Sequence, residues 1–542
     1  MISVDLGTLL PALAPLVGSV LVLVLDVVDP RAQRVHYAIA FISLVVGLFG
    51  TFGALGSPTG DELRTLCLPN GGACFYAATA LTSTLQLAAL LAAAVTLLLA
   101  WPSERSDDTG RTAVTVSLLL AATAGAVGVA GARDIASWLV TLELATLPVV
   151  ALAALPGTRR ALAGAVQLLT TSLVSFAMLV LAAACWYAAT GSPVLATGPA
   201  LAATSTPQRA LLALSVVLVL GGIAFKLSLA PFHAWTPTTY AGAPLPVTVF
   251  LAGVSKVAAL AALLVVVTAV STLGRSALVA VAVLAVASMT LGNLMAMRQD
   301  DVVRLLAWST VAQAGWVVVP LLSVSAFGSR ASAGYLLTYL VATLVAFAAV
   351  MVTVASGGAS GAGPAGAAGA AGPAGAAGPA GAAGAAGPAG AAGEPARGGG
   401  DRRDGRRLDA YRGLVRTHPW AAAALLLALT SLAGLPPGVL GLVGKVVALR
   451  PVLAEGWWVV AVLAAVNVVL GVAVYLRWVR VLLQEAPSPA PDDPASEGGS
   501  SGRVAARRHT RMHPTHTVAL GVGMVLLVLG SVQPQLLLGL LG

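Results

Sequence analysis

Long apolar runs separated by short polar stretches recur along the whole chain. A helix needs about 20 apolar residues to cross a bilayer, and fourteen runs come near that length. Spans are expected at approximately 9–27, 36–55, 79–101, 112–131, 135–155, 161–189, 209–233, 244–270, 276–297, 302–325, 332–355, 419–450, 457–483 and 516–541. No run shows the ten-residue alternation of a barrel strand, and only helices and barrels satisfy their backbone groups in lipid. The pattern therefore predicts an all-α, polytopic membrane protein of about fourteen transmembrane helices.

The distribution of arginine between the loops tests this number of spans. Loops after odd-numbered spans hold most of the arginines, beginning with Arg31 and Arg34, and only the loop after the seventh span has none. Loops after even-numbered spans hold one arginine each, namely Arg64, Arg133, Arg209, Arg275, Arg330 and Arg450. Because cytoplasmic loops carry the excess of Lys and Arg, the alternation predicts both termini outside the cytoplasm.

The composition excludes a series of soluble domains. Hydrophobic residues make up 58% of the 542 residues and charged residues 9%, against roughly 25% charged residues in a soluble domain. The opening run lacks the basic start of a cleavable signal peptide, since Asp5 precedes it. The net charge of +9 has a sufficient cause in the loop arginines, and with no nucleic-acid-binding motif we do not expect nucleic acid as a partner.

Two stretches are not expected to lie in the membrane. Residues 363–393 carry glycine at every third position, a period also found in collagen, but a triple helix needs three chains. A flexible insertion in the loop 356–418 is therefore favoured, and the arginines after it would meet anionic lipid or a partner. The second stretch, the polar loop 484–515, would be disordered. Three histidines near its end would either bind a metal or belong to a solvated loop end: His509, His513 and His516.

The three cysteines match no familiar metal-site spacing. Cys67 and Cys74 bracket a short Leu-Pro-Asn-Gly-Gly-Ala loop, and Cys185 lies in an apolar run. The expected orientation puts the first two outside the cytoplasm, where a disulfide is permitted. Pattern leaves open whether they form one.

The basic residues divide between two environments. All the arginines fall in loops or at helix ends, whereas the three lysines, Lys226, Lys256 and Lys445, each lie within long apolar stretches. A charge at bilayer depth costs at least about 2.5–3.5 kcal/mol, so such residues are functional candidates. Arginine stays protonated, whereas a desolvated lysine can release its proton. The lysines are therefore candidates for proton transfer.

One acid matches these lysines. Glu143 is the one glutamate well inside an expected span, and Asp26 falls near the end of the first span, where it could reach the interface. A buried carboxylate beside a buried lysine would form a pair in which each affects the protonation of the other. The alternative is a static ion pair that locks two helices together.

Helix interruptions accompany two of the lysines. Lys226 is followed by Leu-Ser-Leu-Ala-Pro-Phe-His-Ala-Trp-Thr-Pro, and Lys445 is preceded by Ser-Leu-Ala-Gly-Leu-Pro-Pro-Gly. Proline and glycine break the backbone hydrogen-bond ladder, and broken backbone at membrane depth is tolerated only inside protein or beside a polar cavity. A simple proline kink would explain either break alone. Two broken helices with corresponding lysines in the two halves are typical of an inverted-repeat transporter.

These residues resemble a known family. Phe225-Lys226-Leu-Ser-Leu-Ala-Pro-Phe-His233-Ala-Trp-Thr-Pro, continuing through Val254-Ser255-Lys256-Val257, resembles the signature of subunit N of bacterial NADH:quinone oxidoreductase, respiratory complex I. Gly292-Asn293-Leu, Arg304-Leu-Leu-Ala-Trp-Ser and Ser431-Leu-Ala-Gly-Leu-Pro-Pro with Gly444-Lys445 are similar to further motifs of that family. The resemblance spans nearly the whole chain, and the context of Glu143 is closer to subunit N than to its sister antiporter-like subunits.

The resemblance implies specific roles. Glu143 and Lys226 would be the paired residues of helices five and seven, Lys256 the central relay on helix eight, and Lys445 the lysine of broken helix twelve. His233 matches a family histidine just past the first break. Two positions depart from the family pattern, because Gln313 stands where relatives often carry histidine and Thr238 replaces a loop aspartate.

The expected organisation follows from the spans and the resemblance. Residues 1–111 form a three-helix segment; 112–270 and 276–483 form two inverted five-helix repeats, the second containing the loop 356–418; 484–515 is a polar loop and 516–542 the last helix. The resemblance implies a proton-translocating subunit in the bacterial plasma membrane, assembled with other membrane subunits, while partner subunits bind NADH and quinone. No redox cofactor is expected in this chain, which has no dinucleotide fingerprint, cysteine cluster or haem-ligand pair.

Two other functions stay open on the residues alone. A cation/proton antiporter subunit without a redox partner would use the same lysines. A structural membrane anchor would fit the number of helices but would leave the buried lysines an unexplained cost.

Overall fold

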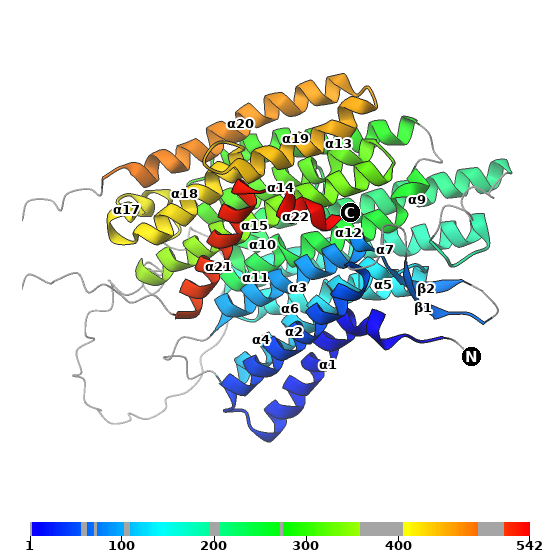
Figure 1. Ribbon diagram of the computed structural model, residues 1–542, viewed down its shortest axis with the longest axis horizontal. Coiled ribbons are helices and arrows are strands. Elements are labelled where there is room, and N and C mark those ends of the chain that lie inside the picture. The colour runs from blue at the N-terminus through cyan, green and yellow to red at the C-terminus, as the bar shows by residue number, and fades with distance from the viewer. Residues whose placement is uncertain are drawn as a thin grey trace, which may run out of the picture.

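The computed structural model describes residues 3–55, 62–69, 73–101, 109–195, 205–270, 275–357, 405–485 and 514–541. Its helices run roughly along one direction and pack side by side, as Figure 1 shows. The residues of the glycine-repeat insertion, 363–393, lie outside the described residues, as do His509 and His513.

The N-terminal part contains three long helices and a β-hairpin. The helices are α1 (Leu6–Val28), α2 (Gln33–Leu55) and α3 (Ala80–Ala100), and the hairpin consists of β1 (Leu63–Cys67) and β2 (Cys74–Ala78). The antiparallel strands pair Leu63 with Ala78 and Cys67 with Cys74. The two cysteines are disulfide-bonded, which answers the question that their spacing left open, and the hairpin is an addition to the expected all-α fold.

The next five spans contain three interruptions. They comprise α4 (Thr109–Gly131), α5 (Ile135–Leu144), α6 (Leu147–Ala154), α7 (Arg159–Thr190), α9 (Thr206–Leu227), α10 (Trp235–Gly242), α11 (Leu245–Ala252) and α12 (Val254–Val270). The seventh span ends at Leu227, six residues before the expected boundary, because Ser228 adopts a left-handed conformation with φ 67°. The fifth and eighth spans are each divided into two helices, and the sequence analysis did not expect these divisions.

The last six spans follow the same plan. They comprise α13 (Arg275–Ala296), α14 (Val302–Val318) with the 3-10 turn η2 (Val319–Leu322), α15 (Ala326–Gly357), α18 (Pro419–Ala433), α19 (Val439–Ala454), α20 (Trp458–Leu483) and α21 (Pro514–Val532). Short elements precede α18 and follow α21: η3 (Leu408–Tyr411), α17 (Leu414–Thr417), α22 (Gln535–Leu538) and η5 (Gly539–Leu541). The twelfth span is broken between α18 and α19, as expected.

The number of spans agrees with the prediction. Within the described residues, 13 helices, interrupted ones included, are long and apolar enough to cross a membrane. The shorter apolar helix α18 combines with α19 into the broken twelfth span, and together these make fourteen.

Side-chain caps fix where several spans begin. Ser205 caps α9 in a capping box with Gln208, and Asp301 caps α14 by accepting from the backbone N–H groups of Val303 and Arg304. Such caps satisfy N–H groups that have no partner within the helix. They fix the residue at which each of these helices begins.

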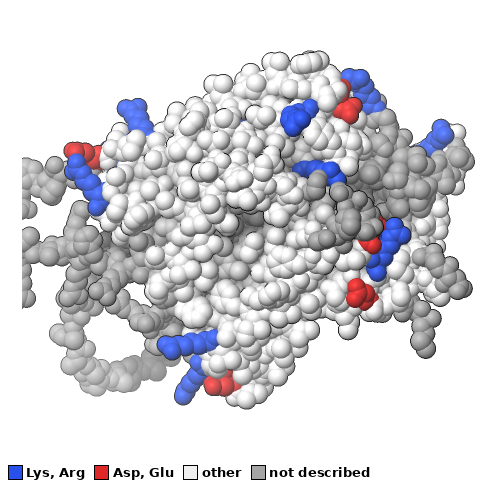
Figure 2. Space-filling view, viewed as in Figure 1, with Lys and Arg blue, Asp and Glu red and all other residues white. Residues whose placement is uncertain are grey.

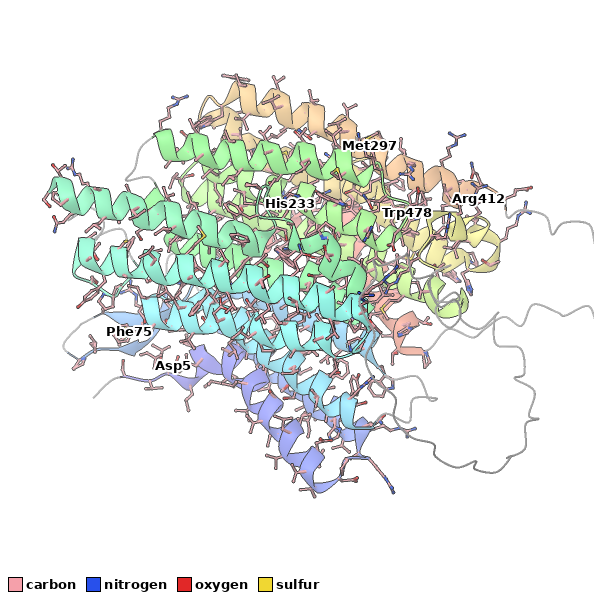
Figure 3. The ribbon with its side chains drawn as sticks, turned by 180° about the vertical axis from the view of Figure 1, so that it is seen from behind. Asp5, Phe75, His233, Met297, Arg412 and Trp478 are labelled. Atoms are coloured by element: carbon pink, nitrogen blue, oxygen red, sulfur yellow. A yellow bond between two sulfur atoms is a disulfide. The ribbon has the colours of Figure 1, made fainter. Side chains whose placement is uncertain are left out.

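Both described ends of the chain lie on the same side of the bundle. The backbone of Ser3 pairs with Cys67 in the hairpin, and Thr84, near the start of α3, donates its hydroxyl to the carbonyl of Leu540 at 2.6 Å. Figure 3 places Asp5 and Phe75 at one end of the bundle and Arg412 at the other, with His233 between them. This arrangement requires an even number of spans; the side that faces the cytoplasm stays a prediction.

Burial separates central from peripheral helices. The spans of α12, α14 and α15 are largely enclosed by protein, whereas α1, α20 and α21 expose apolar faces that include Val24, Val469 and Val525. In Figure 2, charged side chains lie mainly toward the two ends of the bundle, and the surface between them is mostly uncharged. This distribution fits a bilayer that crosses the middle of the bundle.

Candidate functional site

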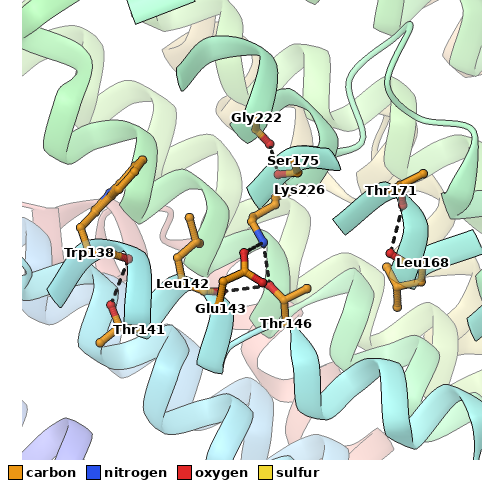
Figure 4. Close-up of polar contacts among 10 residues, drawn as sticks. All are labelled: Trp138, Thr141, Leu142, Glu143, Thr146, Leu168, Thr171, Ser175, Gly222 and Lys226. Carbon is orange, nitrogen blue, oxygen red and sulfur yellow. Dashed lines mark hydrogen bonds and ion pairs between the residues drawn. The ribbon is translucent and has the colours of Figure 1, made fainter. Parts of the chain in front are cut away.

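A buried ion pair joins the interruptions of the fifth and seventh spans. Glu143 lies in the last turn of α5, and Lys226 lies in the last turn of α9. The Lys226 Nζ donates to Glu143 Oε1 at 2.7 Å and to Thr146 Oγ1 at 2.9 Å (Figure 4). The exposed fractions of the two charged side chains are 7% and 12%. The two residues that the sequence analysis paired are therefore in direct contact.

A small cavity adjoins this pair. Its volume is about 30 Å³, and its lining includes Lys226, Thr146, Thr171 and Ser172. Such a volume has room for water, and the hydroxyl groups supply the polar partners that a buried water needs. The cavity can therefore hold a water molecule beside the ammonium group.

The break after α9 brings a second lysine to the first. Lys256, in the first turn of α12, donates to the backbone carbonyl of Lys226 at 3.0 Å and to Ser228 Oγ at 2.6 Å. Its Nζ also lies 4.9 Å from the centre of the Trp235 ring. The last carbonyls of a helix lack intrahelical partners and carry partial negative charge, which favours a cation there. Lys256 is only 2% exposed.

The third lysine repeats this arrangement in the second half. Lys445 on α19 donates to the carbonyls of Leu432 at 2.9 Å and Ala433 at 2.6 Å, at the end of α18. Gly434 follows with φ 82°, and the Trp316 ring lies 5.7 Å from the ammonium. In both halves, a lysine caps the end of a broken half-helix. Within the described residues, neither Lys256 nor Lys445 lies within salt-bridge distance of a carboxylate.

Hydroxyl and amide groups lie beside Lys445. Gln313 on α14 donates to the hydroxyl of Tyr475 at 2.9 Å and accepts from Tyr335. Tyr475 is also 2.6 Å from Ser309 Oγ. The amide nitrogen of Gln313 is 3.5 Å from the same Leu432 carbonyl that Lys445 binds. Gln313, at the position noted as a departure, is thus part of a buried polar network.

Sequence reasoning missed most of this polar surrounding. Four side chains that bond the lysines or Gln313 were not candidates: Thr146, Ser228, Tyr335 and Tyr475. Ser309, which bonds Tyr475, was not a candidate either. Serine, threonine and tyrosine occur throughout the spans, so residue type alone gives no signal. The positive φ that turns the chain at Ser228 has no clear marker in the sequence either.

His233 and Thr238 lie apart from the ion pair. His233 is half-buried in the turn after α9, and its ring centre is 5.1 Å from that of Trp308 on α14. Thr238 on α10 lines a different, open cavity. Within the described ranges, no three His, Cys, Asp or Glu side chains are grouped so that they could hold a metal ion.

Comparison with known proteins agrees with this geometry. Residues 132–360 and 398–471 match the family described as NADH:quinone oxidoreductase/Mrp antiporter, TM. The NADH-quinone oxidoreductase subunit N of Salinispora tropica is 36% identical over 509 residues, which cover 91% of this chain and 88% of that protein. Subunit N 2 of Streptomyces griseus is 33% identical and covers 99% of this chain and 93% of that protein.

Solved structures show the same fold. A chain in respiratory complex I from Thermus thermophilus with bound aureothin superposes with a TM-score of 0.71 and 28% identity, covering 98% of each chain. A chain of the Mrp complex from Dietzia sp. DQ12-45-1b has a TM-score of 0.75 at 20% identity, covering 99% of this chain and 96% of that one, and shows likeness of fold alone. With its buried Glu143–Lys226 pair and its two lysine-capped helix breaks, the chain belongs to the subunit N family of bacterial NADH-quinone oxidoreductases.

Proposed function

We propose that this chain translocates protons as a membrane subunit of a respiratory NADH:quinone oxidoreductase, through Glu143, Lys226, Lys256 and Lys445. The observation that carries the proposal is the buried Lys226–Glu143 ion pair. The ammonium group of Lys256 donates a hydrogen bond to the backbone carbonyl of Lys226 and so lies next to this pair. Burying three ammonium groups in a membrane protein costs free energy, and such residues usually mark a functional path. Proton transfer through this subunit would account for their presence.

The carboxylate would act as the switch. While Glu143 holds Lys226 at 2.7 Å, the charge of the ammonium is compensated. When the carboxylate moves away, an unpaired buried charge is left, so the proton leaves Lys226. Coupling of about 1–3 kcal/mol between two sites is ordinary, and this is enough to bias the direction of transfer at Lys226.

Lys256 and Lys445 would pass the proton on. Their partners are carbonyl oxygens and a hydroxyl group, which accept a hydrogen bond from an ammonium or from a neutral amine. Such partners hold the side chain in place in either protonation state. The transfer between Lys256 and Lys445 would use internal water together with the polar groups around Gln313, and His233 beside Trp308 would assist at the first break.

The redox chemistry would belong to partner subunits. The relatives are named as subunits of NADH-quinone oxidoreductase, so NADH oxidation and quinone reduction would occur elsewhere in the assembly. This chain would hold no redox cofactor of its own and would be driven by conformational changes transmitted through neighbouring membrane subunits.

A cation/proton antiporter subunit is the second candidate. The likeness of fold to a chain of an Mrp complex favours it, but the greater identity to subunit N sequences over most of the chain favours the oxidoreductase. Purification from native membranes distinguishes the two. We expect NADH-oxidising and iron–sulfur subunits to accompany the chain, whereas recovery with membrane antiporter chains alone would support the second candidate.

The relay is tested by three variants of the ion pair in the assembled complex. Glu143→Gln and Lys226→Gln should each lower the protons pumped per NADH oxidised, measured in inverted membrane vesicles with a pH-sensitive dye. The double variant Glu143→Gln/Lys226→Gln leaves no charge stranded, so it should regain stability. If the pair were a static lock, the double variant would also regain pumping; if it is a relay, pumping stays low.

Glu455→Gln is the matched control for the carboxylate. Glu455 is exposed and accepts a hydrogen bond from Ser323 at 2.9 Å, away from the three lysines. Its replacement should leave pumping unchanged. Normal pumping by the single variants at position 143 or 226, with normal NADH oxidation, would remove these residues from the proton path.

A further inference from the structure

An open polar cavity lies away from the lysines, where two helices begin and one ends. Its volume is about 300 Å³, and its lining includes Arg160 near the start of α7, Thr238 on α10, and Asp301 and Arg304 at the start of α14. This volume reaches the lower end of the range for small-molecule sites. Because α10 belongs to the first repeat and α14 to the second, the cavity lies between the two halves of the chain.

The charges that line the cavity are not balanced within it. The Asp301 carboxylate is already used, since it accepts from the backbone of Val303 at 2.8 Å and of Arg304 at 3.0 Å. Within the described part of the chain, neither guanidinium, of Arg160 or of Arg304, forms an ion pair. Two exposed cations therefore border a hollow whose one carboxylate serves as a helix cap.

A third arginine lies beside the cavity and adds to the positive charge. Arg406 donates to the carbonyl of Ala241, near the end of α10, at 2.9 Å, and its own carbonyl accepts from Val302. Burial lowers the pKa of Arg406 below its usual value; Asp301 opposes this shift, and the positive charge of Arg160 adds to it. An anion bound near Arg160 would relieve this repulsion.

The position of the cavity indicates the source of the anion. It lies at helix ends on the side of the bundle whose loops carry most of the arginines, where the headgroups of the bilayer would be. On α7, which contributes Arg160 and Ala163 to the cavity, the exposed apolar residues Leu162, Val166 and Leu173 follow at helical spacing toward the middle of the bundle. A phosphate attached to acyl chains would match both features, whereas a free phosphate would use only the arginines.

We propose that this cavity binds the phosphate of an anionic phospholipid between Arg160 and Arg304, with the acyl chains along α7. Basic pockets between transmembrane helices at the cytoplasmic surface are suited to such headgroups. The bound phosphate would bridge α7 and α14, next to the α10 segment that follows the first helix break. The lipid would thereby hold the two halves together on this side.

The proposal is tested on the whole complex in nanodiscs with a phosphatidylglycerol that carries a photoreactive group on its acyl chain. Crosslinks mapped by mass spectrometry should fall on residues 162–173. Unlabelled phosphatidylglycerol should compete and phosphatidylcholine should not. Each arginine near the surface contributes about a fivefold gain in affinity for anionic lipid. Arg304→Gln should therefore weaken apparent binding about fivefold, and Arg160→Gln/Arg304→Gln roughly thirtyfold.

Two further variants control for charge and folding. Arg209→Gln/Arg330→Gln removes the same charge near the starts of two other helices, α9 and α15, away from the cavity, and should leave the crosslink unchanged. Arg160→Lys/Arg304→Lys keeps both charges and should retain most of the binding. If the double glutamine variant does not assemble, two results still test the proposal: the expected loss of binding in Arg304→Gln, and the expected retention of binding in Arg160→Lys/Arg304→Lys.

Several outcomes would overturn the proposal. Wild-type crosslinking in Arg304→Gln and in the double glutamine variant would exclude the arginines, and equal competition by phosphatidylcholine would exclude phosphate recognition. Displacement by millimolar inorganic phosphate would indicate a free-anion site, and crosslinks to a neighbouring subunit would indicate a protein interface instead. None of these results bears on proton pumping through Glu143 and Lys226, which is measured separately.

Discussion

Among single residues, the three lysines differ in what compensates their charge. Lys226 is bonded to a carboxylate, whereas Lys256 and Lys445 are bonded to carbonyl oxygens, a hydroxyl group and aromatic faces. A carboxylate favours the ammonium form strongly, while carbonyl oxygens hold an amine in either form. We therefore expect Lys226 to be where proton transfer is controlled, and Lys256 and Lys445 to be transfer stations.

Ser228→Gly tests the bond that orients Lys256. Glycine accepts the positive φ of this position, so the variant permits the same backbone conformation while it removes the hydroxyl that accepts from Lys256 at 2.6 Å and from Thr236 at 2.6 Å. A hydrogen bond to a charged group contributes about 1.5–3 kcal/mol, so we expect proton transfer to slow at least about tenfold. The measurement is the initial rate of vesicle acidification at fixed NADH oxidation.

Ser215→Ala is the matched control, because Ser215 lies on α9, the helix that Ser228 follows, and donates one buried hydrogen bond, to Ala182 at 2.7 Å, away from the lysines. It should lower stability slightly and leave the acidification rate intact. Equal rates in the two variants would show that the Ser228 hydroxyl has no part in the relay.

Among the helices, broken spans decide where the lysines can bind. The ends of α9 and α18 expose carbonyls inside the protein, and in each half a lysine from a following helix binds them. The breaks at 228–234 and 434–438 were predictable from their proline and glycine content. The divisions at 145–146 and at Gly253 were not predicted, because a single proline such as Pro148, or a single glycine, within an apolar run does not distinguish a broken helix from a continuous one.

Gly434→Ala tests the break in the twelfth span. An added Cβ would lie 3.1 Å from Lys445 Nζ at a position with φ 82°, so the ammonium would have to shift and its hydrogen bonds to the α18 carbonyls would be perturbed. The left-handed conformation alone costs an alanine about 1–2 kcal/mol. We expect lower thermal stability together with a severalfold loss of pumping.

Gly456→Ala separates the two effects. Gly456 has φ 75°, but nothing lies within 4 Å of an added Cβ. It should show a similar loss of thermal stability and normal pumping. If Gly434→Ala and Gly456→Ala pumped equally well, the contact of Lys445 with the end of α18 would not contribute to proton pumping.

For the molecule as a whole, the hairpin and both described ends lie on one side, and the arginine-rich loops lie on the other. The positive-inside rule predicts that the hairpin lies outside the cytoplasm. A disulfide between Cys67 and Cys74 is consistent with that placement, because the cytoplasm keeps thiols reduced. The two observations are independent of each other.

Thiol labelling tests this orientation. After treatment of intact cells with a membrane-impermeant reductant, an impermeant maleimide should label Cys67 and Cys74, whereas Cys185 is buried and should stay unlabelled. Inverted vesicles treated in the same way should give no label. The Cys67→Ser/Cys74→Ser variant gives the background, and labelling only in inverted vesicles would reverse the assigned topology.

Proline and glycine marked the two breaks, the family resemblance gave the pairing of Glu143 with Lys226, and hydropathy and charge were sufficient to predict the spanning helices and their number. They were sufficient because lipid admits apolar helices and penalises every buried charge. Packing decided that Lys256 and Lys445 cap broken helices, that Gln313 binds two tyrosines, and that three arginines gather around one cavity. In a membrane, the faces of a helix that meet lipid and the faces that meet protein are both apolar. The sequence pattern therefore carries little information about which helices are neighbours, and the contacts follow from the assembled bundle.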